Sequence, residues 1–363
     1  MKLAYKHLFY LFIGCSIVYS CSTNTIDNPK NNEDILYFPP LNSNDWETIS
    51  METLNWDTTA EQDLYDFLNV KQSKAFIILK KGKIVIEWYG NGFDATMNHT
   101  WNSAAKTLSA FTIGIAQQEG LLNINNSSQN YLGANWSSMT NTQEDAVTVK
   151  NHLTMTTGLD YNVPNADCTE PEDLVYKQDP FTFWYYHNAP YTLTHSIVEG
   201  ATNQTFSNYF NNKIRDKIGM QGLWVPFGCY KLYLSTARSM ARFGLLSLNQ
   251  GTWENEVILS DTDYFNDMTN TSQNLNKAYG YLWWLNGKSN YRLPGSEAEY
   301  QGTLIPNAPS DLIAGLGKND QKLYVVPSED LVIVRMGDNA NDSTFGPSGF
   351  DNQLWEKINA VIN

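Results

Sequence analysis

The stretch "HTWNSAAKTLSAFTIGIAQQEGLL", residues 99–122, predicts an amphipathic helix that begins at Ser103. Its apolar residues recur at spacings of three and four, on one helical face: Leu108, Phe111 and Ile115. Gly120 is typical of a helix C-terminus. Lys106 then lies one turn beyond Ser103, on the same side of the helix. This spacing raises the question of whether the amine serves the serine hydroxyl as a base.

The position of Ser103 at a helix start favours a chemical role, although a Ser-x-x-Lys pattern is common by itself. It follows the polar segment "NGFDATMNHT", residues 91–100. First-turn N–H groups have no partner within their helix, and the dipole there favours negative charge. The Ser103 amide therefore suits one half of an oxyanion hole. To act as a base, Lys106 needs its pKa lowered from ~10.4 toward ~7–8, by burial and a neighbouring positive charge.

Two distant hairpins predict the rest of the architecture. Residues 74–90 and 322–338 each hold two apolar runs joined by a turn. Helices are predicted next to them, over residues 57–70 and 350–363. The hairpins are expected to pair into one antiparallel sheet that these two helices cover.

The predicted fold class is therefore α+β, with a large helical subdomain inserted into the sheet. The sheet lobe comprises residues 36–102 plus 300–363, and the helical lobe residues 103–299. A cleft between two such lobes is a common place for a catalytic site.

The first residues predict export. Two lysines in residues 1–7 precede a short apolar run that is too short for a comfortable membrane span. Residues 1–20 are thus predicted to be a signal peptide, and the polar residues 21–35 a flexible tether. "VYSC" resembles a bacterial lipobox in which Cys21 is lipidated, and plain signal cleavage is the alternative. We expect a lipoprotein of the bacterial cell envelope that meets the membrane only through Cys21.

Charge, histidines and cysteines narrow the function classes. The net charge is −14, the pI is about 4.7 and there is no Lys/Arg block, so the composition argues against nucleic acid as a partner. The five histidines show no metal-ligand spacing, and neither a metal nor another cofactor is predicted. In an oxidising compartment, Cys168 and Cys229 are either a disulfide or two separate buried thiols, because the sequence does not supply their distance.

Two further stretches offer partners for Ser103 and Lys106. Tyr186-His187-Asn188 stands just before an amphipathic run. A tyrosine can relay protons if a cation lowers its pKa, and an asparagine amide can hold a lysine amine and a substrate carbonyl. Lys318 follows two glycines and precedes the C-terminal hairpin, where it could supply the positive charge. Taken singly, each of these residues is more often structural.

The order Ser-x-x-Lys, Tyr-x-Asn and a late lysine resembles that of the penicillin-recognising serine hydrolases. The resemblance is to the class C β-lactamase branch, with its related esterases, DD-peptidases and amide hydrolases. It covers roughly residues 36–360 and extends to three supporting stretches: "TVKNHLTMTTGLDY" (148–161), "LYLSTARSMARFGLLSLNQGTW" (232–253) and "YGYLWWLNG" (279–287).

This resemblance implies a role for each matching residue. Ser103 is the expected nucleophile and Lys106 its general base during acylation, and Tyr186 passes protons to the leaving group and activates water for deacylation. The expected substrate-binding residues are Asn188, Lys318, Asp320 and Gln321. By the same resemblance, the positive charge of Lys318 adjusts the pKa of Tyr186. The Gln321 amide N–H completes, with that of Ser103, the oxyanion hole. The reaction is acyl transfer to serine followed by hydrolysis.

The third motif departs from the family pattern. Where these proteins usually carry Lys-Thr-Gly or His-x-Gly, this chain reads Lys318-Asn319-Asp320. An acidic side chain in the groove would disfavour the carboxylate of a β-lactam. We therefore expect an ester, amide or peptide-like small substrate, with the register at Asp320 set by similarity alone.

A non-catalytic envelope binding protein that retains the fold is the alternative, since a fold does not establish an activity. The joint presence of Ser103, Lys106, Tyr186 and Asn188 argues against it. A fluorophosphonate probe separates the two, because it tags only an activated serine.

Overall fold

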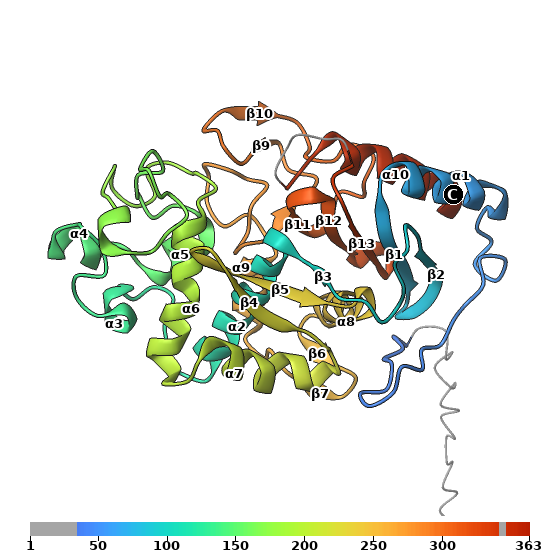
Figure 1. Cartoon of the computed structure of the whole chain (residues 1–363), viewed down its shortest axis with the longest axis horizontal. Helices are drawn as coiled ribbons and strands as arrows, with labels where there is room; N and C mark the ends of the chain where they lie inside the picture. Colours follow the sequence, from blue (N-terminus) through green and yellow to red (C-terminus); the bar gives the residue numbers. More distant parts are fainter. Residues whose placement is uncertain (1–34, 341–345) are drawn as a thin grey trace, which may run out of the picture. The chain divides into compact units, whose positions relative to one another are not determined.

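A six-stranded antiparallel sheet lies at the centre of the fold (Figure 1). The structure is a computed structural model that describes residues 35–340 and 346–363. Of these, Leu36–Asn363 forms one compact unit. The predicted signal peptide, Cys21 and nearly all of the tether lie outside the described residues. In the order β2-β1-β13-β12-β11-β8, the strands are Lys83–Tyr89, Ser73–Lys80, Leu331–Gly337, Gln321–Val326, Ile313–Gly317 and Trp284–Leu285.

The predicted pairing of the two hairpins is confirmed. Strands β1 and β2 form the first hairpin, and β12 and β13 form the second around the short 3₁₀ helix η8, Pro327–Glu329. They join through β1 and β13, with Ile77 opposite Val334. Two strands of the sheet were not predicted: β11, and β8 at residues 284–285, which lies inside the predicted helical lobe.

Helices cover both faces of the sheet. Helices α1 (Glu61–Val70) and α10 (Gly349–Ile362) pack together on one face, and α8 (Ala237–Leu248) packs on the other (Figure 1). Successive side chains of β12 point to opposite faces of the sheet, and each meets a different helix. Tyr324 makes a hydrogen bond to Asp351 of α10, whereas Leu323 lies against Gly244 of α8. As predicted, α10 buries its apolar stripe: Leu354, Trp355, Ile358 and Val361.

The inserted middle contains more strand than the sequence suggested. Besides α8, the helices between the two hairpins are α2 to α7 and α9: Lys106–Gln118, Gln129–Leu132, Asn141–Ala146, Val149–Thr154, Asn188–Thr202, Phe206–Phe210 and Thr262–Met268. Three small antiparallel sheets accompany them, β3-β5-β4, β6-β7 and β10-β9. In chain order their strands are His99–Thr100, Leu223–Phe227, Tyr230–Ser235, Thr252–Trp253, Glu256–Val257, Asn290–Arg292 and Glu299–Gln301.

Helix α2 is more deeply buried than an amphipathic helix would be. Every residue from Lys106 to Ala116 is buried, because α6 and α9 pack against it inside the fold. The hydroxyls on its expected polar side therefore have internal partners: Thr107 donates to Ala104 O at 2.7 Å, and Ser109 Oγ lies 3.0 Å from His195 Nε2. Ser103 itself stands before α2, in a 3₁₀ turn, η3, over Asn102–Ala105.

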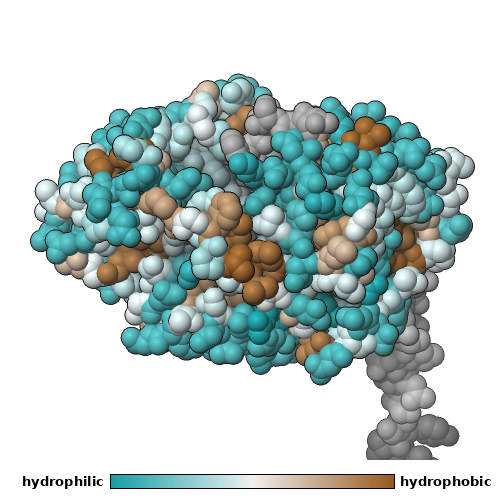
Figure 2. All heavy atoms as spheres, in the orientation of Figure 1, coloured by the Kyte–Doolittle hydropathy of each residue, from teal (hydrophilic) through white to brown (hydrophobic). Residues whose placement is uncertain are grey.

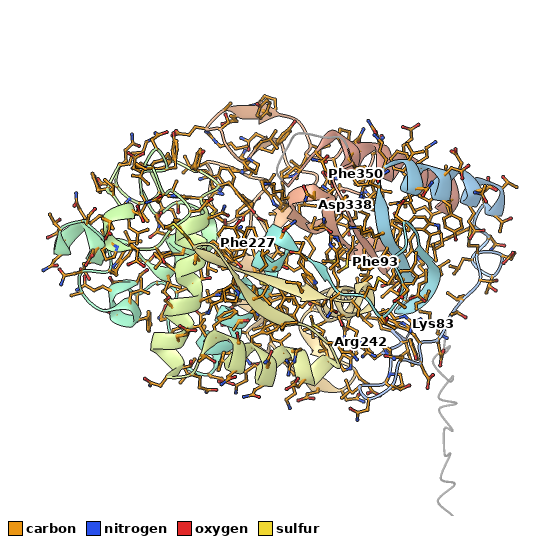
Figure 3. The ribbon with its side chains drawn as sticks, in the orientation of Figure 1. Lys83, Phe93, Phe227, Arg242, Asp338 and Phe350 are labelled. Carbon is orange, nitrogen blue, oxygen red and sulfur yellow. A yellow bond between two sulfur atoms is a disulfide. The ribbon has the colours of Figure 1, made fainter. Side chains whose placement is uncertain are left out.

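The face drawn in Figure 2 is mostly hydrophilic, with a group of apolar residues over β4. Leu223 and Phe227 of that strand are 49% and 57% exposed, and Figure 3 places Phe227 at the end of β4. In the same view Arg242 lies at α8, where its guanidinium donates to Pro40 O and Ile218 O. Within residues 35–340 and 346–363, no helix has the length and apolar character of a membrane span.

Candidate active site

A cavity of about 320 Å³ opens beside the 3₁₀ turn that carries Ser103. Its walls come from η3, the start of α6, β5, the β9–β10 connection and the turn after β11. Five of the predicted site residues line it: Ser103, Lys106, Tyr186, Asn188 and Lys318. Residues up to 215 positions apart in the sequence therefore meet around one hollow of the size that small-molecule sites have.

Lys106 connects the nucleophile candidate to α6. Its Nζ lies 3.0 Å from Ser103 Oγ and 2.9 Å from Asn188 Oδ1. The turn before α2 is held by Asn102, which adopts a φ of +47° and donates from Nδ2 to Lys318 O at 2.7 Å. The one-turn spacing predicted from the sequence thus becomes a direct contact, even though Ser103 lies in the 3₁₀ turn rather than in α2.

The environment of Lys106 favours an uncharged amine. The side chain is 2% exposed, and its Nζ lies 4.9 Å and 4.2 Å from the ring centroids of Tyr186 and Tyr191. Burial lowers the pKa of Lys106 from 10.5 to about 7, and the charge of Asp167 opposes that shift. Of the two causes expected from the sequence, burial accounts for this fall in pKa, and a neighbouring cation does not contribute.

Tyr186 is enclosed by other aromatic rings. Trp284 stacks on it at 5.7 Å between centroids, and Tyr279 meets it edge-on at 6.2 Å. Burial raises the pKa of the Tyr186 phenol, and a hydrogen bond with the Ser103 side chain opposes that rise only in part. The expectation that a cation lowers this pKa is therefore wrong, and the phenol keeps its proton at neutral pH.

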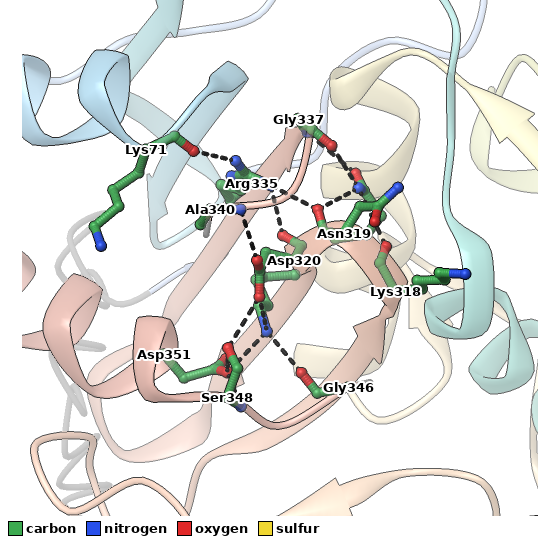
Figure 4. A network of polar contacts seen from close by, with 12 residues as sticks. Lys71, Lys318, Asn319, Asp320, Arg335, Gly337, Ala340, Gly346, Ser348 and Asp351 are labelled. Atoms are coloured by element: carbon green, nitrogen blue, oxygen red, sulfur yellow. Dashed lines mark hydrogen bonds and ion pairs between the residues drawn. The ribbon is translucent and has the colours of Figure 1, made fainter. Parts of the chain in front are cut away.

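The structure corrects the predicted roles of two residues that follow Lys318 in the sequence, Asp320 and Gln321. Asp320 is 3% exposed and does not line the cavity. Its carboxylate instead accepts from Ser348 Oγ at 2.9 Å and from the Ala340 amide at 3.0 Å, and it pairs with Lys322 (Figure 4). The reason is local: left-handed φ values of +60° at Asn319 and +58° at Asp320 turn this side chain toward α10.

Gln321 is also buried and lies outside the cavity lining. It begins β12, and its side-chain Nε2 donates to Gly337 O at 2.6 Å. The strand that approaches the serine turn is β11: a Cβ on Gly317 would lie 2.4 Å from Trp101 O and 3.1 Å from Ala104 N. Only a glycine allows this approach, and the Gly-Leu-Gly run at residues 315–317 was its signal in the sequence.

Sequence reasoning missed Asp167. Its Oδ1 accepts from Asn188 Nδ2 at 2.9 Å, and it lines the cavity. The next residue, Cys168, is joined to Cys229 by a disulfide, so the choice between a disulfide and two thiols is decided in favour of the bond. The pair of cysteines was the only hint that residue 167 would be brought to the site. In the described part of the chain, no three His, Cys, Asp or Glu gather as metal ligands would.

The sequence matches a family model described as beta-lactamase over residues 70–338. The chain belongs to the beta-lactamase family. That span includes every one of the cavity-lining residues that the sequence predicted. A search of curated proteins gives no match.

Solved structures of this beta-lactamase fold superpose on most of the chain. A putative 6-aminohexanoate-dimer hydrolase from Bacillus anthracis has a TM-score of 0.67 at 19% identity, covering 89% of this chain and 88% of its own. A putative beta-lactamase from Bacteroides dorei DSM 17855 has a TM-score of 0.67 at 15%, covering 85% and 99%. A D-stereospecific amidohydrolase from Streptomyces sp. has 0.57 at 14%, covering 83% and 98%. At these identities the likeness shows the fold.

Proposed function

We propose that the protein is an exported serine hydrolase that cleaves an ester, amide or peptide-like bond through an acyl-Ser103 intermediate. One observation carries the proposal: the Lys106 amine is 3.0 Å from Ser103 Oγ, at a cavity, with a pKa lowered by burial to about 7. At neutral pH a large share of this amine is unprotonated, which is what a general base for a serine hydroxyl requires.

Acylation uses the three side chains in sequence. Neutral Lys106 takes the proton of the Ser103 hydroxyl as Oγ attacks the substrate carbonyl carbon. The Ser103 N–H stabilises the tetrahedral oxyanion, and we assign the second donor, in place of the Gln321 amide, to the N–H of the cavity-lining Lys318 directly after β11. When the bond to the leaving group breaks, the protonated Tyr186 phenol donates to it, and the Lys106 ammonium reprotonates Tyr186. The serine proton has then moved, in two steps, to the leaving group.

Deacylation reverses the direction of the proton. A water molecule attacks the acyl carbon while neutral Lys106 accepts its proton. The acid product leaves when the bond to Oγ breaks, and Lys106 returns the proton to Ser103. Asn188 keeps the amine in place throughout, through its 2.9 Å contact with Nζ.

The cavity lining and one fold neighbour support the proposed substrate class. Lys231 and Lys318 line the cavity together with Asp167, so polar or charged groups of a small substrate have partners there. One fold neighbour is named an amidohydrolase, which supports an amide bond as the target. The sequence argument against β-lactams no longer applies, because the Asp320 carboxylate points away from the cavity.

A fluorophosphonate probe tests the proposal. The Ser103 oxygen bonds to phosphorus, fluoride leaves with the P–F electron pair, and Lys106 takes the serine proton, so an active enzyme gains a mass tag on Ser103. We expect tagging of the wild type and none of a folded Ser103→Ala variant. An untagged wild type would instead favour the non-catalytic binding protein. Initial rates with nitrocefin, p-nitrophenyl esters and peptide amides then rank the substrate classes.

We also propose that the protein is anchored to the bacterial cell envelope by a lipid on Cys21. The support is the signal-like sequence of residues 1–20 followed by a cysteine. Growth with radiolabelled palmitate should label the wild type, and Cys21→Ala should abolish the label. A labelled Cys21→Ala variant would contradict the anchor.

A further inference from the structure

Three consecutive residues tie one cavity loop to the rest of the site. Ala166 O accepts from His187 Nε2 at 2.7 Å, Asp167 Oδ1 accepts from Asn188 Nδ2 at 2.9 Å, and Cys168 forms the disulfide with Cys229. Because Asp167 is exposed, its own hydrogen bond competes with water and would by itself hold the carboxylate weakly. The anchors on both sides restrict the loop and make the contact persistent.

The contact with Asp167 decides which way the Asn188 amide faces. An amide has an oxygen that accepts and a nitrogen that donates, whereas an ionised carboxylate only accepts. Asp167 therefore selects Nδ2 for itself and leaves Oδ1 for Lys106, as the 2.9 Å contact with Nζ shows. If the amide were reversed, its NH₂ would point at the amine, where it would donate to the lone pair that must receive the serine proton.

We propose that Asp167 is a positioning residue that fixes the Asn188 amide and thereby the Lys106 amine, and that the Cys168–Cys229 disulfide holds Asp167 in that place. This inference rests on the proposed function of Ser103 and Lys106. The bond joins the loop to the turn between β4 and β5, and the first two residues of β5, Tyr230 and Lys231, line the same cavity.

The charges around Lys106 give the proposal a signature in pH. Tyr186, Tyr191 and His195 face the amine from α6 and the segment before it, and Lys231 and Lys318 line the cavity from β5 and the end of β11. Among the described lining residues, Asp167 is the only carboxylate. Its removal leaves cations and neutral rings around Lys106, so the pKa of the amine falls further.

The first experiment measures fluorophosphonate tagging of Ser103 against pH in the wild type and in Asp167→Asn. In Asp167→Asn we expect the limiting tagging rate at high pH to fall about tenfold, because the Asn188 amide loses its fixed orientation. The midpoint of the curve of rate against pH should move down by roughly half a pH unit, because the carboxylate charge is gone. Glu172→Gln, an exposed carboxylate on the same loop, is the matched control and should change neither quantity. A change in the midpoint alone, in the rate alone, or in neither would overturn the positioning role.

The second experiment asks whether the disulfide acts through Asp167. The Cys168→Ser/Cys229→Ser double variant should lower the limiting rate severalfold, and it should lower it no further in the Asp167→Asn background. Additive effects in this cycle would overturn the role of the disulfide. Thermal melts of all variants, with the intact disulfide of Asp167→Asn verified by mass, show that each rate belongs to a folded protein.

A third readout does not need the hydrolase to be active. In Ser103→Ala protein with ¹⁵N-labelled lysine, NMR titration of Lys106 should give a lower pKa when Asp167→Asn is added. If the wild type is not tagged by the probe and this pKa still falls, the proposed function fails while the electrostatic link to Asp167 stands. An unchanged pKa overturns the link whatever the activity.

Discussion

Two buried lysines, Lys322 of β12 and Lys106 at the start of α2, have contrasting partners. Lys322, which is fully buried, donates to Asp351 Oδ2 at 2.8 Å and pairs with Asp320 at 3.3 Å. Lys106 has a hydroxyl, an amide oxygen and two aromatic rings as its nearest neighbours, and the described contacts of its Nζ include no carboxylate.

The difference shows that burial does not by itself make a lysine reactive. A buried ammonium between two carboxylates has its charge compensated, and it serves to hold the segment around Gly346 and the start of α10. A buried lysine among neutral groups has no such compensation. Desolvation then destabilises its charged form, and the pKa of Lys106 falls to about 7. The first arrangement supports the fold, and the second suits the role of base that we propose for Lys106.

The largest predicted effect is that of replacing Lys106, the proposed base. Lys106→Ala should slow fluorophosphonate tagging of Ser103 by about 10³–10⁴-fold, because Lys106 is the one amine among the described hydrogen-bond partners of Ser103 Oγ. Intact-mass kinetics at pH 8 measure the rate, with circular dichroism to show that the variant is folded. Tagging at the wild-type rate would remove Lys106 from the mechanism.

The next largest effect concerns Lys322, the buried lysine that pairs with carboxylates. Asp351→Asn leaves the buried Lys322 with less compensating charge and should lower the free energy of unfolding by about 3–5 kcal/mol. Denaturant titration at pH 7 gives this quantity. In the protein that remains folded, Ser103 should still be tagged at nearly the wild-type rate. A large loss of tagging without a loss of stability would mean that the Lys322 cluster belongs to the chemistry.

Replacing the buried Lys106 should have a smaller effect of opposite sign, a gain in the free energy of unfolding. The pKa of Lys106 is about 7 in the folded protein and 10.5 in the unfolded chain, so the unfolded state binds more protons between these values and wild-type stability rises with pH across that window. Below pH 7 the folded protein carries the full cost of a buried charge. At pH 6 the free energy of unfolding of Lys106→Met should therefore be about 2–4 kcal/mol higher than that of the wild type.

Denaturant unfolding of both proteins at pH 6 and pH 9.5 checks this prediction. The advantage of Lys106→Met should shrink toward the higher pH, where the wild-type amine is neutral in the folded state. A variant that is less stable than the wild type at both pH values would show that the contacts of Lys106 outweigh the cost of its burial.

The sequence was most informative where the relation between residues is local. Ser103 and Lys106 meet because a helical turn brings residues three apart together, and this relation survives the change from α-helix to 3₁₀ turn at Ser103. Tyr186 and Asn188 could be placed only through the resemblance to a family, since nothing in their own spacing points to residue 106. Both do line the cavity.

The failures arose where the outcome depends on backbone angles or on distant anchors. At Asp320, a left-handed turn reverses the side chain, and the letters Lys-Asn-Asp do not reveal that φ. Asp167 reaches Asn188 through a loop whose position is set by a disulfide to residue 229 and by His187. Such contacts depend on how the remote parts of the chain fold, so a single sequence could not predict them.

The measurement that tests the central claim most directly is the pH dependence of Ser103 phosphonylation in the wild-type protein. The rate should rise about tenfold for each pH unit in the acid range and level off above a single midpoint near pH 7, where the Lys106 amine loses its proton. A midpoint near pH 10, or a rate that does not change between pH 5 and pH 9, would contradict a neutral lysine as the base.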